Sequence, residues 1–555
     1  MHCNGIESMM KILAKPDTQY YAGIMQRHYE WKKINIETFI DSIDFIDVED
    51  HVEYALNSVI TKKVCDDFDE FDEISITDGQ QRFITITLFI TALCAFIKNH
   101  DIQNKKVNYK NIMSKYLLNI TRNGDQRYKL RPRGKDFETL KMLINDLPNG
   151  IISPKAGSST MIRAYKMFYN LFTSGNYEDY YSKLRYLTVV NLQCEEHEDE
   201  NRIFSNINTG GRNVDLFTKI KAYALGRLDP DTQELYYKMY FADIEERDSK
   251  LKNGFAKAYL LFHYGNISRN QEHSYTLFKR LRDSFDDEKD FFKDFSNFRE
   301  YFLKIHNNSF KDKKVNEIIE TLKLVLLPSH YSLIIRIIQS YENSKIDKNE
   351  FISSIDILRR VGLKTSIFDK KEWDILRKNL FNYINWFSEV KPFESIIDRI
   401  KKYAGIIPSD EQFENTLLVS DMYTSSSNKR KLTKNILLNI ENNHMGAGRI
   451  NSDHFSIEHI CPQTPCRLWS GIINKDEHND YVHSLGNLTL LAKEHNSLNS
   501  NASFEDKKMI YENDKLYLSN GIAGYNKWDA DNIQKRTKTL SREAVEIFST
   551  DRVLR

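Results

Sequence analysis

Four residues in the last quarter of the chain have the types and spacing that phosphodiester chemistry needs. A carboxylate and a histidine stand side by side at Glu458-His459, and Asn487 and Asn496 follow in a short second block. Hydrolysis assisted by one divalent ion needs oxygen ligands for the ion and an uncharged imidazole that takes a proton from water. The pattern therefore predicts a metal-dependent nuclease site near the C-terminal end of the chain.

The second block supports this interpretation through its local structure. Glu458 and His459 alone are weak evidence, because most such residues are surface groups or satisfied core polar groups. Gly486-Asn487 predicts a short turn into the apolar segment Leu488–Leu491, and Asn496 follows nine residues after Asn487. This distance allows a β-turn-β element to be followed by a helix that carries Asn496. The fold then needs only to bring this unit against Glu458 and His459.

A second candidate site lies near the N-terminus. Ile74 and Ile76 alternate with polar residues as in a half-buried strand, and Asp78-Gly79 predicts a sharp turn. An apolar helix should follow, with Gln80, Gln81 and Arg82 in its first turn. Free N–H groups, the helix dipole and a guanidinium would together bind an anion such as phosphate. A plain strand-turn-helix with a polar first turn is an equally simple interpretation of this run. The chain contains no Gly-rich loop ending in Lys-Ser/Thr, which excludes the P-loop mechanism.

Two sets of motifs, in this order along the chain, resemble the GmrSD-type modification-dependent (type IV) restriction endonucleases. The N-terminal set, over roughly the first 225 residues, resembles the ParB-like domain of that family. Its motifs are Gln26–Trp31, Asp78–Arg82, Phe204–Gly211 and Asp215–Lys221. The C-terminal set, over roughly the last 130 residues, resembles its HNH, or ββα-metal, nuclease domain. Its motifs are Ile457–Ile460, Pro462-Gln463, Leu485–Leu491, Asn496, Asn499, Phe504, Lys507, Lys508 and Tyr511.

The resemblance assigns roles in the C-terminal site. His459 would be the general base, Glu458 and Asn496 would hold Mg²⁺ or Mn²⁺, and Asn487 would orient His459 by a side-chain hydrogen bond. Most HNH nucleases have Asp before the histidine, whereas this chain has Glu458. Asn499 is an alternative to Asn496 as ligand. Oxygen donors suit Mg²⁺ or Mn²⁺ better than zinc.

Two further expectations concern the surroundings of this site. Cys461 and Cys466 lack the second cysteine pair of a structural zinc site, although His478 and His483 could complete an irregular one. Basic residues flank the site and are candidates for phosphate contacts or for solvated surface charges. They are Lys429, Arg430, Lys431, Lys434, Lys507 and Lys508.

The resemblance also implies binding and hydrolysis of a nucleoside triphosphate, GTP or ATP, in the N-terminal domain. The residues that match the family's nucleotide site are Asp78, Gly79, Gln80, Gln81, Arg82, Gln26 and Arg27, with Asn208 and Lys219 as further candidates. The family usually has a proline before its Gln-Arg pair. Here Gly23-Ile24-Met25 lacks it, so the local backbone can differ.

Composition limits the class of protein. The 555 residues exceed what one hydrophobic core usually supports. Because 79 Lys and Arg nearly cancel 78 Asp and Glu, any contact with nucleic acid must come from a local basic patch. Six scattered cysteines and the absence of a secretory leader favour a reducing cytoplasm. The longest apolar runs are too short to cross a bilayer.

The elements that must position both sites form an α+β, multidomain chain. We expect a ParB-like α/β domain at 1–225, an all-α connecting domain at 226–425 and an HNH nuclease domain at 426–555. The expected function is NTP-dependent or NTP-regulated cleavage of DNA, modified phage DNA in particular. Two alternatives stay open: a regulatory NTPase and DNA-binding protein with an inactive HNH module, and an HNH nuclease that cuts RNA. A homodimer is one assembly that the sequence permits.

Overall fold

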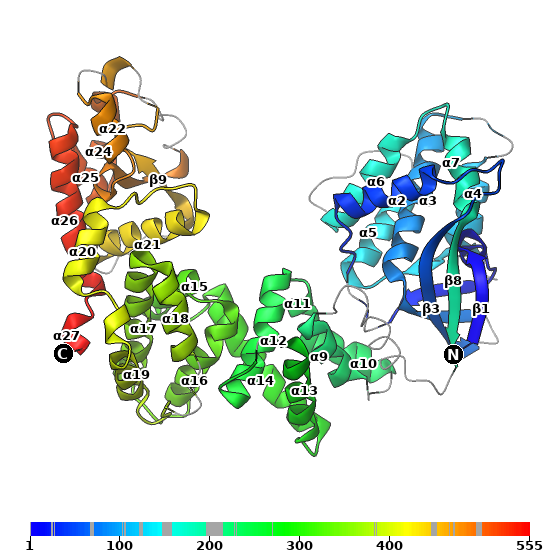
Figure 1. Ribbon diagram of the computed structural model, residues 1–555, viewed down its shortest axis with the longest axis horizontal. Helices are drawn as coiled ribbons and strands as arrows, with labels where there is room; N and C mark the ends of the chain where they lie inside the picture. The colour runs from blue at the N-terminus through cyan, green and yellow to red at the C-terminus, as the bar shows by residue number, and fades with distance from the viewer. Residues whose placement is uncertain are drawn as a thin grey trace. The chain divides into compact units, whose positions relative to one another are not determined.

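The chain forms two compact units, Met1–Ala242 and Asp243–Arg555, each described here by itself (Figure 1). The predicted boundaries at residues 225 and 425 stay predictions. The computed structural model describes residues 2–554 except for 24–25, 27, 67–71, 103, 105–106, 121–125, 147–157, 196–214, 227, 229, 269, 382, 384–385, 446–451, 465–466, 470–471 and 495–501.

The first unit is built on a mixed six-stranded sheet. In spatial order the strands are β1 (His2–Ser8), β8 (Leu187–Cys194), β3 (Tyr54–Asp66), β4 (Asp72–Asp78), β2 (Thr18–Ala22) and β7 (Leu130–Arg131). β1 with β8 and β3 with β4 are antiparallel, whereas β3 with β8, β2 with β4 and β2 with β7 are parallel. A short pair, β5 (Leu118–Ile120) and β6 (Gln126–Tyr128), stands apart. The strand predicted around Ile74 is confirmed as β4.

A long apolar helix, α3 (Gln80–Asn99), forms the centre of this unit. It begins where predicted, because β4 ends at Asp78 and Gly79 adopts a left-handed φ of 96° as the N-cap. A side chain at Gly79 would also meet Val59 Cγ1 at 2.8 Å, so the turn requires glycine. α3 is long and apolar enough to cross a membrane, but its side chains are almost all buried within the unit. It is a core helix.

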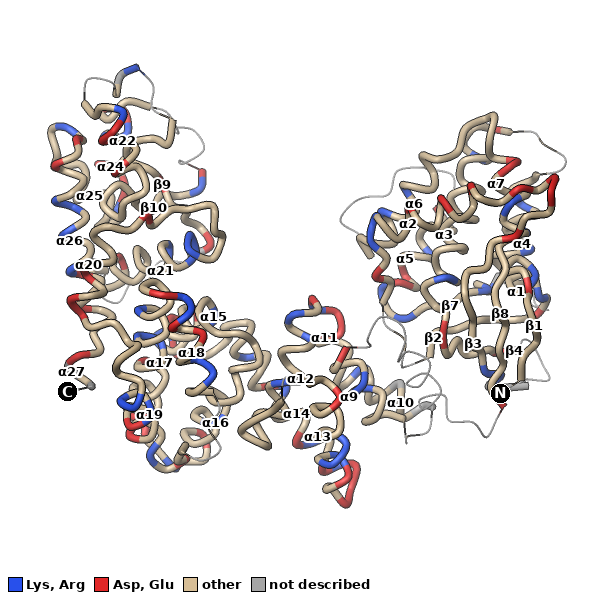
Figure 2. Tube along the Cα trace, in the orientation of Figure 1, with Lys and Arg blue, Asp and Glu red and all other residues tan. Residues whose placement is uncertain are grey.

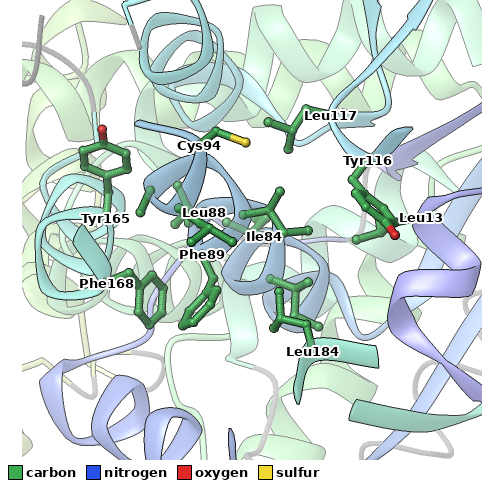
Figure 3. Close-up of a cluster of buried hydrophobic side chains, with 14 of the residues drawn as sticks. Leu13, Ile84, Leu88, Phe89, Cys94, Tyr116, Leu117, Tyr165, Phe168 and Leu184 are labelled. Atoms are coloured by element: carbon green, nitrogen blue, oxygen red, sulfur yellow. The ribbon is translucent and has the colours of Figure 1, made fainter. Parts of the chain in front are cut away.

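Aromatic and aliphatic side chains from several helices pack around α3. Ile84, Leu88 and Phe89 of α3 lie among Phe168 of α6 and Leu184 of η1 (Figure 3). Phe89 and Phe168 meet at a ring-centroid distance of 5.0 Å. The helices of this unit besides α3 are α1 (Met9–Leu13), α2 (Lys33–Asp44), α4 (Tyr109–Tyr116), α5 (Gly134–Asn145), α6 (Ser159–Leu171), α7 (Tyr177–Lys183), η1 (Leu184–Tyr186), α9 (Leu216–Leu225), α10 (Pro230–Tyr236) and η3 (Tyr237–Phe241).

The second unit begins with the helical region that the sequence predicts. Its helices are α11 (Ala242–Glu245), α12 (Ser249–Tyr264), α13 (Gln271–Asp283), α14 (Glu288–Asn307), α15 (Lys313–Val325), η4 (Pro328–His330), α16 (Tyr331–Glu342), α17 (Lys348–Phe368), α18 (Lys370–Leu380), α19 (Pro392–Lys401), η5 (Ala404–Ile406), α20 (Asp410–Val419) and α21 (Ser427–His444). Aspartate or asparagine side chains cap many of them, as at Asp248 and Asp312.

One apolar run of this region is divided before a proline. Leu322–Leu327 has the apolar character of a buried helix, but α15 ends at Val325 and Leu327 is extended and exposed. The proline at 328 is the cause, because it disfavours the helical conformation of the residue before it.

The C-terminal part of this unit carries a two-stranded antiparallel sheet, β9 (Phe455–His459) and β10 (Leu488–Ala492). The surrounding elements are η6 (Ser452–His454), η7 (Arg467–Trp469), α22 (Lys475–Tyr481), η8 (Leu485–Asn487), α24 (Phe504–Asn513), α25 (Tyr517–Ala523), α26 (Ala530–Phe548) and α27 (Asp551–Leu554). Leu488 and Leu490 of β10 share a core with Leu363 of α17 and Leu417 of α20. The mixed helix and strand content confirms the α+β class.

Candidate functional site

Glu458 and His459 are the last two residues of β9 and have separate surroundings. Glu458 pairs with Thr489 of β10, and His459 pairs with Leu488. Because successive side chains of a strand alternate between its two faces, the carboxylate and the imidazole project in opposite directions. The two predicted site residues are therefore adjacent in the chain and positioned by different neighbours.

The His459 imidazole is buried and neutral. It packs edge-on against the ring of Tyr423, with centroids 4.5 Å apart, and its Nε2 lies 3.3 Å from Nδ1 of His483. Burial, with smaller contributions from His483 and Lys507, lowers the pKa of His459 to about 3. The ring is therefore uncharged at physiological pH, as a proton acceptor must be.

The partners of His459 are held by backbone contacts. Met422 N donates to the carbonyl oxygen of His483 at 2.7 Å, and Tyr423 stacks on the His483 ring at 6.0 Å. Thr433 of α21 donates to the carbonyl oxygen of Met422 at 2.5 Å. The start of α21 and the segment before η8 thus support the imidazole from one side. No motif around Tyr423 indicates this contact, and the sequence indicates His483 only as part of an irregular zinc site.

Glu458 is paired with a buried lysine. Nζ of Lys507, on α24, lies 2.5 Å from Glu458 Oε1 and also donates to the carbonyl oxygen of His459 at 2.7 Å. Both side chains are buried. Burial raises the pKa of Glu458, and Lys507 partly offsets this. Lys507 is thus neither of the two things predicted for it, a phosphate contact or a solvated surface charge, because its side chain is only 1% exposed and bound to protein.

Two buried hydroxyl groups accompany Glu458 without a partner among the described residues. They are Thr489 Oγ1, opposite Glu458 in the sheet, and the hydroxyl of Tyr511, one turn after Lys507 on α24. Burial and the nearby Glu458 carboxylate raise the pKa of Tyr511 well above its usual value, so its hydroxyl is a donor. Buried polar groups are normally hydrogen-bonded. Both hydroxyl groups therefore lie buried with unused hydrogen-bonding capacity, which water bound beside Glu458 could satisfy.

The predicted hydrogen bond from Asn487 to His459 is not formed. Asn487 Oδ1 accepts from Cys461 N at 2.8 Å and from Trp528 Nε1 at 3.0 Å. Its Nδ2 donates to the carbonyl oxygens of Cys461 and Val482, both at 2.9 Å. These four bonds use the full capacity of the amide. Asn487 therefore fixes the backbone that follows His459 and not the imidazole itself.

Helix α26 holds the segment of Asn487 from the other side. A Cβ at Gly486 would overlap Ile533 O and the side chain of Thr537, so glycine permits the contact. The buried guanidinium of Arg536 donates to the carbonyl oxygens of Gly486 and Leu488 at 2.6 and 2.8 Å. The Gly486-Asn487 turn predicted from sequence is thus confirmed as η8, and its glycine serves close packing.

Asn496 and Asn499, the two alternative metal ligands predicted beside Glu458, lie outside the described residues. Among the residues that the structure describes, no group of three or more His, Cys, Asp and Glu could hold a metal ion. Burial raises the pKa of the Cys461 thiol to about 12. Cys466 is also outside the described part. Of the residues predicted to bind Mg²⁺ or Mn²⁺, Glu458 is thus the one that lies within the described part of the chain.

Basic side chains lie along α21 and α26 (Figure 2). Arg430 covers the Tyr423 ring at 5.6 Å and donates to the carbonyl oxygen of Thr424 at 2.6 Å. Lys508 donates to the carbonyl oxygen of Tyr525 at 3.1 Å. Burial and nearby Lys493 lower the pKa of Lys434. Lys429 and Lys431 lie at the start of α21, and Lys431 is exposed. These positions remain candidates for phosphate contacts.

At the N-terminal site, the structure brings most of the predicted residues together. Asp78 ends β4, Gly79 caps α3, and Arg82 donates to the carbonyl oxygen of Ser58 at 2.7 Å. The Arg82 guanidinium lies 3.8 Å from Asp78 Oδ2. Burial lowers the pKa of Arg82, and Asp78 partly offsets this. Asp78 and Arg82 thus flank the start of α3, where unpaired N–H groups and the helix dipole favour an anion.

Three glutamines complete this site. Gln26 Nε2 donates to the carbonyl oxygen of Thr77 at 2.6 Å. The amide of Gln81 bonds to both sides of a neighbouring segment, donating to His28 O at 3.2 Å and accepting from Glu30 N at 3.0 Å. Gln80 is only 2% exposed, and neither the oxygen nor the nitrogen of its amide has a partner among the described residues. Such a group is complete only when a ligand or water binds.

Three further residues were predicted as candidates for the nucleotide site. Arg27 and Asn208 lie outside the described residues. Lys219 is on α9, whose N-cap is Asp215. Sequence reasoning did not select Asp136 of α5, which accepts from the Tyr29 N–H at 2.6 Å and lies 3.3 Å from Nδ1 of His28. No local motif around Asp136 indicates this contact.

Two family models match the chain, and together they include both candidate sites. One describes the N-terminal domain of the GmrSD restriction endonuclease and matches residues 10–225; the other describes the C-terminal domain of GmrSD restriction endonucleases and matches residues 407–543. The protein is thus a restriction nuclease of the modification-dependent class, and DNA is its substrate. It belongs to the GmrSD restriction endonuclease family. No curated protein matches the chain.

Proposed function

We propose that this protein nicks or cleaves modified phage DNA in the cytoplasm by metal-assisted hydrolysis, with His459 as general base. The observation that carries the proposal is the buried, neutral imidazole of His459, held between Tyr423 and His483 at the end of β9. A general base must be deprotonated and fixed, and it contributes about 10² to 10⁴ in rate.

In the proposed reaction, His459 takes a proton from water while the water oxygen attacks the phosphorus. The bond from phosphorus to the leaving sugar oxygen then breaks. Glu458, with Asn496, would hold one Mg²⁺ or Mn²⁺, which would neutralise the charge that develops on the phosphate. Lys507 keeps the backbone of His459 and the Glu458 carboxylate in one arrangement. Asn487 fixes the chain after β9, which is a positioning role.

The N-terminal site would bind a nucleoside triphosphate, GTP or ATP, and its hydrolysis would regulate cleavage. Support for this comes from the start of α3, the Arg82 guanidinium and the Gln80 amide, which has no partner in the part of the chain that the structure describes. Helix N-termini with a nearby guanidinium are suited to phosphate groups. The ParB-like fold and the HNH fold of the two domains are part of the same proposal.

One observation favours a second candidate function. The Lys507 ammonium occupies an oxygen of the Glu458 carboxylate that a metal ion would need. If that ion pair persists, the protein would be a regulatory NTPase and DNA-binding protein whose nuclease module is inactive. This candidate predicts nucleotide hydrolysis that depends on Arg82 and no nicking with any divalent metal.

The test is a challenge of the purified protein with matched DNAs. Plain, hydroxymethylated, glucosylated and phosphorothioate DNAs and one RNA are incubated with Mg²⁺ or Mn²⁺, each with and without GTP or ATP. Cleavage of at least one modified DNA in preference to plain DNA supports the proposal. Cleavage of RNA alone supports the RNA alternative, and nucleotide hydrolysis without any cleavage supports the regulatory NTPase.

A further inference from the structure

A second pair of polar groups in the N-terminal unit lies buried and incomplete. His28 precedes α2, and Asp136 lies in the first turn of α5. His28 Nδ1 is 3.3 Å from Asp136 Oδ2, and the Asp136 side chain has no exposure to solvent. The other nitrogen, His28 Nε2, and the other oxygen, Asp136 Oδ1, are buried without a partner among the described residues.

The segment that carries His28 is fixed from several sides. Tyr29 N donates to Asp136 Oδ2 at 2.6 Å, and Thr160 donates to the Tyr29 carbonyl oxygen at 2.9 Å. The left-handed Gly134, φ 50°, opens α5 beside the imidazole, and a Cβ there would lie 3.3 Å from His28 Cε1. The imidazole is therefore positioned by the Asp136 carboxylate and by the following residue, Tyr29, whose N–H and carbonyl groups are both bonded.

His28 also lies beside the proposed nucleotide site. Gln81, in the first turn of α3, donates to His28 O and accepts from Glu30 N. Gln81 stands between Gln80, whose amide is unpartnered, and Arg82. The Gln81 side chain thus links the start of α3 to the segment that carries the His28 imidazole.

The pairing sets the tautomer of the imidazole. A carboxylate only accepts hydrogen bonds, so His28 Nδ1 carries the proton that faces Asp136, and in the neutral imidazole Nε2 then carries a lone pair. A buried acceptor without a donor costs about 1–3 kcal/mol. Among the described residues Nε2 meets no donor, which a pair that served only stability would not require. A histidine oriented by a buried aspartate, with its other nitrogen ready to accept a proton, is the arrangement of a general base.

We propose that His28, oriented by Asp136, is the general base for nucleoside triphosphate hydrolysis at the start of α3. This proposal rests on the nucleotide site proposed above. His28 Nε2 takes a proton from water as the water oxygen bonds to the γ-phosphorus. The bond from the γ-phosphorus to the β–γ bridging oxygen breaks, which releases nucleoside diphosphate and inorganic phosphate. The proton then passes from His28 to phosphate or solvent. Asp136 is a positioning residue.

The experiment compares phosphate release and nucleotide binding in four full-length proteins. MgGTP and MgATP are used as substrates, and a fluorescent analogue of each nucleotide reports binding. The variants are His28→Gln, Asp136→Asn and, as a matched control, His263→Gln. The control removes another His–Asp pair, in which His263 Nε2 lies 3.0 Å from Asp294 Oδ2 in the helical region. Thermal unfolding of each variant is recorded beside the rates.

His28→Gln should lower kcat by about 100-fold or more, while the dissociation constant of the nucleotide changes less than about threefold. Asp136→Asn keeps an acceptor for Tyr29 N but can present N–H to His28 and reverse its tautomer, so kcat should fall at least tenfold with binding retained. His263→Gln should hydrolyse nucleotide as the wild type does.

Four outcomes would overturn the proposal. If His28→Gln hydrolyses nucleotide at the wild-type rate, the base is elsewhere and the nucleotide site stands. If its binding falls in proportion to its rate, or if Asp136→Asn keeps the wild-type kcat, the pair is structural or a ligand contact. If the wild type neither binds nor hydrolyses any nucleotide, the proposed nucleotide function fails together with the pair.

Discussion

Lys507 binds both residues of the Glu458-His459 pair at once, its Nζ lying 2.5 Å from Glu458 Oε1 and 2.7 Å from the carbonyl oxygen of His459. The side chains of Glu458 and His459 project in opposite directions from β9. The buried Lys507 ammonium therefore holds Glu458 by its carboxylate and His459 by its backbone carbonyl. This arrangement makes the carboxylate a part of the scaffold as well as a candidate metal ligand.

The first prediction concerns this ion pair. Lys507→Met keeps the length of the side chain but leaves a buried, unpaired carboxylate, which should destabilise the protein by about 3–5 kcal/mol. Combining it with Glu458→Gln should recover much of the loss. Urea unfolding followed by tryptophan fluorescence measures both effects. Lys508→Met, one residue later on α24, is the control and should cost under about 1 kcal/mol. An unfolding midpoint for Lys507→Met equal to that of the wild type would contradict the assigned contact.

The second prediction concerns Asn487. Its amide makes four hydrogen bonds to Cys461, Val482 and Trp528, so Asn487→Ala leaves buried groups unpaired and should cost about 3–5 kcal/mol without any metal present. Asn513→Ala, which removes one exposed bond to Met509 O, should change stability by less than about 0.5 kcal/mol. If Asn487→Ala loses nicking while its stability in EDTA is unchanged, a direct role on His459 would have to be restored.

The third prediction follows from the lowered pKa of His459. Its pKa is about 6.5 when unfolded and about 3 when folded, so the unfolded chain binds more protons in this range. Stability due to His459 is therefore complete above pH 6.5 and falls by up to about 1.4 kcal/mol per pH unit toward pH 3. Unfolding curves at several pH values in EDTA should show wild type losing stability relative to His459→Gln on acidification. A difference that stays constant from pH 7 to pH 4 would show that His459 is not buried as a neutral base.

The fourth prediction tests the nucleotide site through stability. Gln80→Met replaces a buried amide, which has no partner among the described residues, by an apolar group of similar size. The free energy of unfolding of the nucleotide-free protein should therefore stay the same or rise by about 1–3 kcal/mol. Nucleotide binding should weaken at least tenfold. The comparison variant Gln81→Met should instead lose stability, because it removes two bonds to the His28 segment. A destabilised Gln80→Met that binds nucleotide normally would assign Gln80 to the fold alone.

The sequence predicts those features that depend on neighbouring residues. The turn at Asp78-Gly79 and the apolar run after it predict β4 and α3, and the types of Glu458 and His459 predict the nuclease site. Partners from distant segments could not be predicted, since 49 residues separate Glu458 from Lys507 and 24 separate His459 from His483. The predicted hydrogen bond from Asn487 to His459 was wrong for the same reason. The Asn487 amide bonds instead to backbone groups and to Trp528, which only the fold brings near it. Likewise, nothing near Asp136 in the sequence shows that it meets His28.

The central claim, that His459 is the base of a working nuclease, is tested most directly by plasmid nicking. Supercoiled modified plasmid is incubated with Mg²⁺ or Mn²⁺ and wild type, His459→Ala or His454→Ala, with and without nucleotide. His454 is exposed and lies five residues before His459, so it is a matched control. We expect wild type and His454→Ala to nick the plasmid and His459→Ala to be slower by at least about 100-fold while still folded. Equal nicking by wild type and His459→Ala, or none by wild type on any substrate, would contradict the account.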